Sequence, residues 1–284
     1  MERRYLIPYL LLLPAVLYLL GFIGYPLIQA FYLAFTKDGA FSLDTVRRAV
    51  SDYYFWDAIK NTLLFGAVIV PIQLTLAVVL ALFMNRAFKG RDLGIYALII
   101  PLTISDVAAG LIWFSMLSPY GFLNKMLMNI GIIDTPIYFF GYQYRMREFL
   151  VIVLAEIWRA TSIVFVIILA GLQMISREYI EAAEVFGAGY WTRLRHIVLP
   201  MLKPSIQSAL IIRTLFAMQV FGIVLILAGR DIPVLAAEGF RQMVDIKDPG
   251  VASIYALIIA GVSLVLAALY VKFLRAEYLE VGRE

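Results

Sequence analysis

Long runs of apolar residues are the feature that most limits the folds open to this chain. An α-helix rises about 1.5 Å per residue, so about 20 apolar residues cross a hydrocarbon core of about 30 Å. Runs of this kind recur along the sequence, near residues 8–35, 62–84, 94–117, 149–172, 205–228 and 251–272. The sequence therefore predicts an all-α, polytopic membrane protein with six transmembrane helices.

Composition supports this class and excludes others. Of the 284 residues, 63% are hydrophobic and 15% are charged, whereas roughly half of a soluble domain is apolar. There is no cysteine and a single histidine, His196, which excludes disulfides, thiolate metal sites and a histidine-based metal cluster. The net charge of +4 comes from residues beside the apolar segments and not from a basic stripe, so we expect no nucleic-acid partner.

The distribution of positive charge indicates the orientation in the membrane. The apolar run after Arg3 and Arg4 is too long for a cleaved secretory signal, so we expect a retained first helix. Six spans place both termini on one side of the membrane, and Lys and Arg prefer cytoplasmic loops. The shortest loop on the side of the termini carries Arg86, Lys89 and Arg91. We therefore expect both termini, and the connection over residues 173–204, to be cytoplasmic.

The connection over residues 173–204 has a helical pattern. Apolar and small residues recur at i, i+3, i+4 and i+7, at Tyr179, Ala182, Ala183 and Phe186. Ser176 is a suitable N-cap, and Gly187 can end the helix in a left-handed turn. A second short helix over residues 191–198 follows, and we expect Pro200 and Pro204 to end it. The pattern predicts a helix–turn–helix held next to the membrane.

Such an amphipathic element either lies in the lipid interface or inserts into a groove of a partner. Acidic residues line one face of the first helix, at Glu178, Glu181 and Glu184. Because these carboxylates repel anionic lipid, we favour the partner groove. An ordinary amphipathic surface helix is the alternative.

The same loop carries a recognisable signature. The run Glu181-Ala182-Ala183, followed by Gly187 and then by Ile197, Leu199 and Pro200, resembles the EAA motif of bacterial and archaeal ABC importer permeases. The resemblance implies that the loop is a coupling helix, which fits a cleft in a separate ATPase and pairs Glu181 with a basic group there. Phe186 departs from the motif, because the family usually has Asp at this position. We therefore expect an apolar contact with the ATPase at Phe186.

Weaker matches extend over almost the whole chain. The segments Tyr25-Pro26, Lys60–Leu63, Gly121–Asn124 and Ala170–Leu172 are similar to MalF-type sugar permeases. The resemblance implies the type I ABC importer permease fold in a prokaryotic plasma membrane, with the coupling helix between the fourth and fifth spans. It implies a first helix and outer loop over residues 1–60 and a five-helix core over residues 61–284. The implied partners are a MalG-like second permease subunit, two ATPase subunits and an extracytoplasmic sugar-binding protein.

Charges inside the spans are a clue independent of the loop. An ionised side chain at the centre of a membrane helix costs roughly 2.5–3.5 kcal/mol, so it usually faces a partner or a cavity. The candidates are Asp106, Glu156, Arg159 and Arg213, whose formal charges cancel. Glu156 and Arg159 are at i, i+3 and can pair on one helix face. Two interpretations stay open: mutual neutralisation inside the bundle, and a role in the translocation path.

In the sugar permeases, substrate contacts come from the helices before and after the EAA loop. Alignment on the loop carries this role to Glu156, Trp158 and Arg159 on the first helix, and to Gln219 and Gly222 on the second. Trp158 can stack on a sugar ring, although packing or an interfacial position explains it equally well. The resemblance favours a disaccharide such as maltose or trehalose, with other sugars and glycerol phosphate as alternatives.

The energy source is expected outside this chain. The sequence contains no Gly-x-x-x-x-Gly-Lys-[Ser/Thr] phosphate loop, so we expect no cofactor here and place ATP and Mg²⁺ in the partner ATPases. An ion-coupled secondary transporter, with Asp106 or Glu156 as its proton or sodium site, leaves the EAA loop unexplained. A membrane hydrolase needs a nucleophile and a base together, and the sequence has no such signature. We expect a transport subunit and not an enzyme.

Overall fold

A computed structural model describes residues 3–273 of the chain. The predicted all-α class is confirmed, and the exception is a two-stranded antiparallel hairpin of β1 (Thr36–Lys37) and β2 (Ala40–Phe41). Asp38 and Gly39 both have positive φ, as a two-residue hairpin turn requires. Within the described part of the chain, five helical segments are long and apolar enough to span a membrane, and a sixth crossing is present if a sharply bent helix pair is counted as one span.

The first apolar segment is a helix interrupted by a wide turn. It consists of α1 (Arg3–Leu19), the π-helical η1 (Leu20–Gly24) and α2 (Tyr25–Phe35). Pro26 donates no backbone hydrogen bond, and its ring crowds the preceding turn of an α-helix. The π turn, closed by the bond from the Tyr25 amide to the Leu20 carbonyl, gives the ring room, so the segment stays helical through the proline.

The third apolar segment is not the single straight span predicted over residues 94–117. It divides into α5 (Arg91–Ile99) with the 3₁₀ turn η2 (Ile100–Thr103), and α6 (Asp106–Leu117), which continues towards α7 (Phe122–Asn129). The two parts meet at an angle of 102°. Pro101 cannot donate to the helix ladder, and the Ser105 hydroxyl accepts from the Ala108 amide at 3.2 Å and caps a new helix. These two residues explain the bend.

The expectation that Pro200 and Pro204 end the second loop helix is wrong. The structure joins α10 (Tyr190–Arg193), the π-helical η4 (Leu194–Val198) and α11 (Leu199–Met218) into one helix. The amide of Leu199 bonds to the carbonyl of Leu194, so a π turn again accommodates the proline after it. This helix is interrupted later, at residues 219–221, before α12 (Gly222–Leu227).

The chain forms two compact units that are each built from separated segments. Unit 1 comprises Met1–Trp56 and Leu235–Ala260, and unit 2 comprises Asp57–Val234 and Gly261–Glu284. In unit 1, Arg48 of α3 (Asp44–Val50) is paired with Asp248, which precedes α14 (Pro249–Phe273). Asp52 accepts from Gln242 of α13 (Leu235–Val244) at 3.0 Å. The predicted division at residue 60 stays a prediction.

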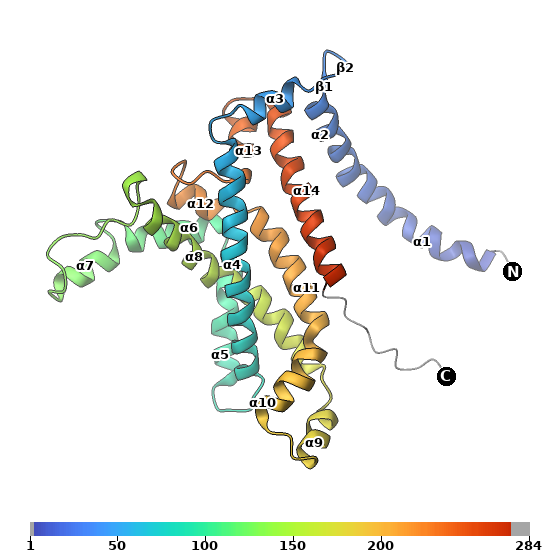
Figure 1. Cartoon of the computed structure of the whole chain (residues 1–284), viewed down its shortest axis with the longest axis vertical. Helices are drawn as coiled ribbons and strands as arrows, with labels where there is room; N and C mark the ends of the chain where they lie inside the picture. The colour runs from blue at the N-terminus through green and yellow to red at the C-terminus, as the bar shows by residue number, and fades with distance from the viewer. Residues whose placement is uncertain (1–2, 274–284) are drawn as a thin grey trace. The chain divides into compact units, whose positions relative to one another are not determined.

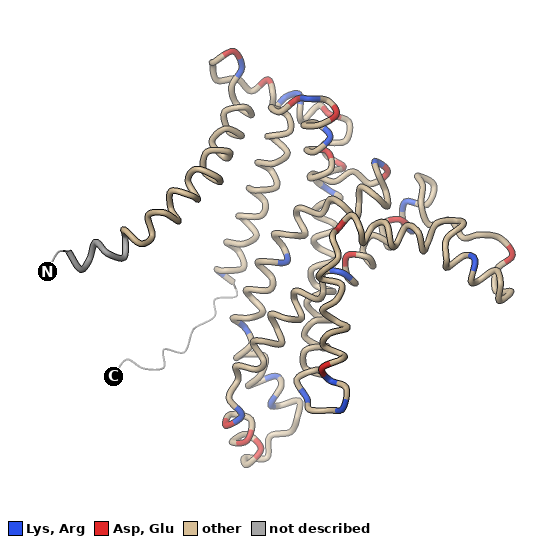
Figure 2. Tube along the Cα trace, turned by 180° about the vertical axis from the view of Figure 1, so that it is seen from behind, with Lys and Arg blue, Asp and Glu red and all other residues tan. Residues whose placement is uncertain are grey.

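Unit 2 contains the elements that carry the candidate site. Its core lies among α4 (Phe55–Met84), α8 (Arg145–Gln173) and α11, where apolar residues such as Ala77, Phe165 and Leu202 are buried. The 3₁₀ turn η3 (Tyr142–Tyr144) precedes α8. At one end of these helices lie α9 (Arg177–Val185) and α10 (Figure 1). Charged residues gather at that end, and few lie along the helices (Figure 2).

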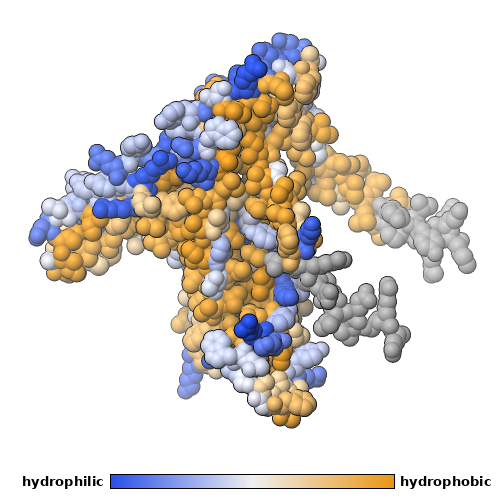
Figure 3. All heavy atoms as spheres, viewed as in Figure 1, coloured by the Kyte–Doolittle hydropathy of each residue, from blue (hydrophilic) through white to orange (hydrophobic). Residues whose placement is uncertain are grey.

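The long helices keep much of their apolar surface exposed. In the windows that qualify as spans, the buried share is 33% in α4, 61% in the segment with α8 and 17% in α14. Hydrophobic side chains cover much of the visible face of these helices (Figure 3). In water such a surface promotes aggregation, whereas in a bilayer it faces lipid or another membrane subunit. The exposure is the pattern expected of a multi-pass membrane protein.

Gly171 of α8 packs closely against Ser205 of α11. A Cβ at this position would lie 2.1 Å from the Ser205 hydroxyl oxygen and 2.6 Å from the Ser205 Cβ. Gly171→Ala is therefore expected to lower the free energy of unfolding by about 1–3 kcal/mol. The measurement is thermal unfolding of the detergent-solubilised protein. Gly261→Ala is the matched control in α14, because no atom lies within 4 Å of the added carbon. Equal melting temperatures for the two variants would contradict this packing.

Candidate functional site

The predicted coupling helix is present as α9 with both of its expected ends. The Ser176 hydroxyl accepts a hydrogen bond from the Glu178 amide at 3.3 Å, which confirms the predicted N-cap. Gly187 has a φ of +77°, and the bonds from the Ala188 amide to the Ala183 carbonyl and from the Gly187 amide to the Glu184 carbonyl, both 2.9 Å, form a Schellman motif. The turn after α9 therefore depends on glycine.

The far end of α9 presents an apolar surface that no described residue covers. Phe186 is 90% exposed and Val185 is 86% exposed, and Glu181 and Ala182 are also exposed. Two adjacent, largely exposed apolar side chains form a patch of the kind that marks a contact with a protein or a membrane. Ile197 and Leu199 are half-buried on the next helix.

The loop that contains α9 is held to the helix that follows it by an ion pair. Glu184 of α9 and Arg193 of α10 form an ion pair. Because α10 continues through η4 into α11, this pair connects α9 with the fifth span. At its other end α9 is joined to α8 by a short turn. The loop is thus connected directly to the two helices that carry most of the intramembrane charges.

The structure brings the intramembrane charges together in unit 2, beginning with a buried pair. Glu156 of α8 and Arg213 of α11 are only 1% and 2% exposed, and Arg213 Nη2 lies 2.7 Å from Glu156 Oε2. Gln73 of α4 completes this part of the network. Its Oε1 accepts from Arg213 Nε, and its Nε2 donates to the Glu156 carbonyl at 2.8 Å. Sequence reasoning missed Gln73, although a lone amide in an apolar span was an available signal.

Arg159 extends the network towards the surface. Its Nη2 lies 3.2 Å from Glu156 Oε1 and 2.8 Å from Asp106 Oδ1. The side chain of Asp106 is 38% exposed, so the network runs from a dry end at Arg213 to an accessible end at Asp106. Mutual neutralisation, one of the two interpretations left open by the sequence, is therefore observed. A role in the translocation path stays a prediction.

The other predicted path residues lie on α8, on α12 and at the interruption between α11 and α12. Trp158 of α8 is 38% exposed and meets Trp113 of α6 edge to face, with ring centroids 6.3 Å apart. Gln219 is exposed at the interruption between α11 and α12. Gly222 is buried, and a Cβ there would lie 2.7 Å from the Asp106 Cβ. The close approach that Gly222 permits in this structure is that of α12 to α6.

Two helix interruptions therefore meet beside the network. The bend before Asp106 and the break before Gly222 leave irregular backbone at one place in unit 2. Such backbone at membrane depth is tolerated where it is buried in protein or lines a polar cavity. Among residues 3–273, no group of three or more His, Cys, Asp or Glu is arranged to hold a metal ion. Irregular backbone and paired charges therefore lie together at this place in unit 2.

Comparisons with known proteins agree with this geometry. Residues 73–276 match a protein family described as binding-protein-dependent transport system inner membrane component. The trehalose transport system permease protein SugA of Mycobacterium tuberculosis is 30% identical over 97% of this chain and 90% of its own length. The trehalose/maltose transport system permease protein MalF of Thermococcus litoralis is 32% identical over 78% of this chain and 76% of its own length.

A solved structure has a similar fold over nearly the full chain. It belongs to a bacterial ABC transporter involved in the import of the acidic polysaccharide alginate. The TM-score is 0.83 at 26% identity, and the match covers 98% of this chain and 97% of the solved chain.

The buried pair makes a stability prediction. Glu156→Gln leaves Arg213 charged and poorly compensated in a dry environment, so the free energy of unfolding is expected to fall by about 3–5 kcal/mol. The double change Glu156→Gln with Arg213→Gln removes both charges and is expected to cost less than the single change. Thermal unfolding in detergent measures both, with the exposed Glu178→Gln as the control. A double variant less stable than the single variant would contradict mutual neutralisation.

Proposed function

Because the chain belongs to the family of binding-protein-dependent transport system inner membrane components, it is the membrane-spanning permease subunit of an ABC importer, and we propose that its cargo is an uncharged sugar. The family match covers residues 73–276, and relatives such as SugA align along nearly the whole chain. A subunit of this family is a multi-pass inner-membrane protein without a catalytic domain, and ATP binds to the partner ATPases.

The observation that carries the cargo proposal is that Arg159 and Arg213, in the described spans, both have carboxylate partners. Arg213 is held by Glu156 and Gln73, and Arg159 by Glu156 and Asp106. An anionic substrate is normally recognised by a cation that is free to pair with it. In the described spans these two guanidiniums already have carboxylate partners, so the path favours a neutral solute. Glycerol phosphate and acidic sugars are disfavoured for the same reason.

The remaining groups suit the hydroxyls and ring faces of a sugar. Trp158 and Trp113 provide partly exposed aromatic surface, and Gln219 can both donate and accept hydrogen bonds. Arg159 Nε is buried and has no hydrogen-bond partner among the described residues. Trehalose or maltose is our first candidate, and the names of the relatives SugA and MalF support it.

Coupling to ATP hydrolysis is proposed to pass through α9. Glu181 is exposed and available to a basic group of an ATPase, and Phe186 is available to an apolar pocket. Phe186 replaces the acid usual in the family, so a docking surface matched to this chain needs an apolar contact there. Two ATPase subunits, a MalG-like second permease and an extracytoplasmic binding protein complete the proposed assembly, with both termini of this chain in the cytoplasm. The termini themselves lie outside the described residues.

The helices give this coupling a mechanical route. The continuous helix from Tyr190 to Met218 is about 40 Å long at about 1.5 Å per residue. It leads from the ion pair with α9 to the interruption at Gln219. Closure of the ATPases on ATP would draw the coupling helices together and tilt α8 and α11 with them. The path would then change from inward-facing to outward-facing, and the binding protein would release the sugar into it.

Ion-coupled secondary transport is the rival of a different class. Its sodium or proton site would need Asp106 or Glu156 as an available carboxylate. Both carboxylates are instead paired with arginine, which lowers their affinity for a cation. The exposed tip of α9 also has no role in that mechanism.

Two changes in and beside α9 test the coupling proposal. Glu181→Ala and Phe186→Ala are each expected to reduce ATP-dependent sugar uptake by about tenfold or more, because each removes a contact that is desolvated only in the complex. Membrane insertion should be unchanged. The measurement is uptake into proteoliposomes together with co-purification of the ATPase. Glu178→Ala, in the first turn of the same helix, is the control. Uptake by this chain alone, driven by an ion gradient without ATP, would refute the proposal.

A competition assay tests the cargo. Uptake of labelled trehalose is expected to be inhibited by maltose and not by glycerol 3-phosphate. Trp158→Ala and Gln219→Ala should raise the KM for sugar by about tenfold each, since each removes one stacking or hydrogen-bonding group. Trp56→Ala, which removes an exposed tryptophan of unit 1, is the control. Inhibition by anionic sugars that equals inhibition by neutral sugars would contradict a neutral path.

A further inference from the structure

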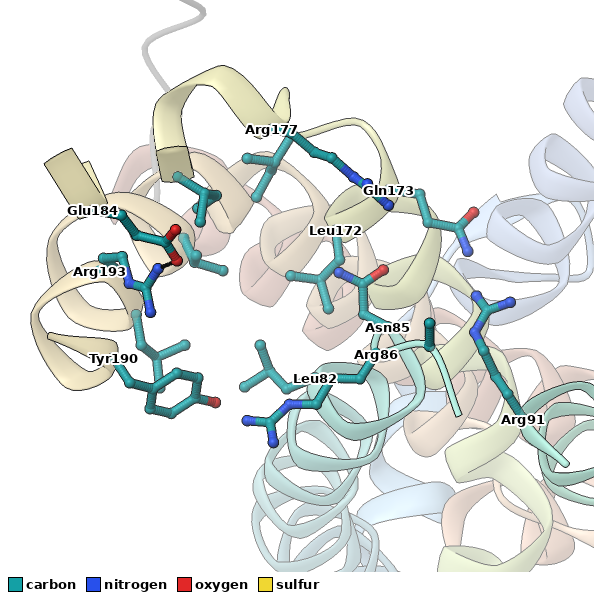
Figure 4. Close-up of a pocket in the computed structure, with 15 residues that line it drawn as sticks. Leu82, Asn85, Arg86, Arg91, Leu172, Gln173, Arg177, Glu184, Tyr190 and Arg193 are labelled. Carbon is teal, nitrogen blue, oxygen red and sulfur yellow. Dashed lines mark ion pairs between the residues drawn. The ribbon is translucent and has the colours of Figure 1, made fainter. Parts of the chain in front are cut away.

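A cavity of about 780 Å³ lies behind the coupling loop, entirely within unit 2. It is bounded by the end of α4, the loop into α5, the end of α8, α9 and the helix that begins at Tyr190 (Figure 4). Neither the EAA motif residues nor the intramembrane charges line it. The proposed function gives this cavity no role.

The polar part of the cavity lining is strongly cationic. Four arginines line it, Arg86, Arg91, Arg177 and Arg193, against one carboxylate, Glu184. Glu184 is already paired with Arg193. The amides of Asn85 and Gln173 add neutral donors to the same lining. The lining therefore has an excess of positive charge and of hydrogen-bond donors.

Two of these guanidiniums are available to a ligand. Arg177 has no side-chain hydrogen bond or ion pair to any residue in the part of the chain that the structure describes. Arg86 lies over the Tyr190 ring, 5.2 Å from its centroid, a contact that leaves its N–H groups without acceptors among residues 3–273. Arg91, in contrast, donates to the Met84 carbonyl at 2.6 Å. Arg86 and Arg177 belong to elements far apart in the sequence, and the cavity brings both into one lining.

The remaining wall of the cavity is apolar. Its residues are Leu82, Leu172, Ile175, Ile180, Leu194 and Val198. A cationic side next to an apolar wall is the combination that basic pockets between membrane helices offer to the headgroup and glycerol region of an acidic lipid. The carboxylates of Glu178 and Glu181, which disfavour lipid on the outer face of α9, are not part of this lining.

We propose that this cavity binds a phosphate-ester anion, held by Arg86 and Arg177. Because the apolar wall suits the glycerol and acyl region of a lipid, the anion is the headgroup of an acidic phospholipid. Guanidinium groups bind phosphate oxygens through charge-assisted, often bidentate hydrogen bonds. Bound there, the phosphate connects the α4–α5 loop with the first turn of α9. It thereby holds the coupling helix in one orientation. This consequence rests on the proposed coupling role, whereas the binding itself does not.

The test measures anion binding to the full chain in neutral detergent by calorimetry. The probes are dihexanoylphosphatidylglycerol, dihexanoylphosphatidylcholine and inorganic phosphate. The acidic lipid is expected to bind more tightly than the zwitterionic one, and added salt should weaken its binding. The double change Arg86→Gln with Arg177→Gln should weaken it by about tenfold or more. The matched control is Lys89→Gln with Arg195→Gln, which removes equal charge from exposed positions nearby that do not line the cavity.

The outcomes separate the possible sources of the anion. Tight binding of phosphatidylglycerol alone supports a lipid, and competition by inorganic phosphate at the same arginines supports a soluble phosphate ester. Equal affinity for the two lipids, or equal loss in the control variant, would overturn the proposal. The proposal would also be overturned if added ATPase subunits displaced the acidic lipid and the double variant lost ATPase binding. An acidic segment of the ATPase would then occupy the cavity. The salt and lipid comparisons on the unmodified chain need no variant to fold.

Discussion

A glutamate and an arginine buried inside a membrane protein are stabilised by pairing with each other, because burying an unpaired charge in a medium of low dielectric costs free energy. Glu156 and Arg213 meet this requirement across α8 and α11, and Gln73 adds α4 by bonding to both. The attraction between apolar side chains has no preferred direction, whereas a hydrogen bond requires a particular distance and angle. The pair therefore fixes the register of three helices in unit 2.

The remainder of unit 2 extends this fixed arrangement in two directions. Towards the accessible end, Arg159 carries the network to Asp106, where a bend and a helix break meet at Gly222. Towards the coupling loop, α8 and α11 stay in close contact at Gly171 and lead into the two ends of the loop. The proposed substrate path and the coupling helix are thus attached to the same pair of helices.

Three irregular points of the described backbone lie beside prolines, with different results at different places. Before Pro26 and Pro200 a π turn leaves space for the proline ring, and the helix continues. At Pro101 the helix tightens into a 3₁₀ turn, and the chain bends once Ser105 provides a new cap. Whether a proline ends a helix depends on the residues after it. An apolar helical segment continues the helix beyond Pro200, whereas a capping residue begins a new helix beyond Pro101.

Features that depend on neighbours along the chain could be predicted from the sequence alone. Apolar length predicted the membrane class and most spans, and the caps at Ser176 and Gly187 predicted the ends of the coupling helix, because such signals act within a few residues. Tertiary structure decided the rest. The pairing of Arg213 with Glu156 and Gln73, the approach of Gly222 to Asp106 and the arginine-lined cavity join segments far apart in sequence. Their contacts depend on how whole helices are aligned in register, which no local pattern specifies.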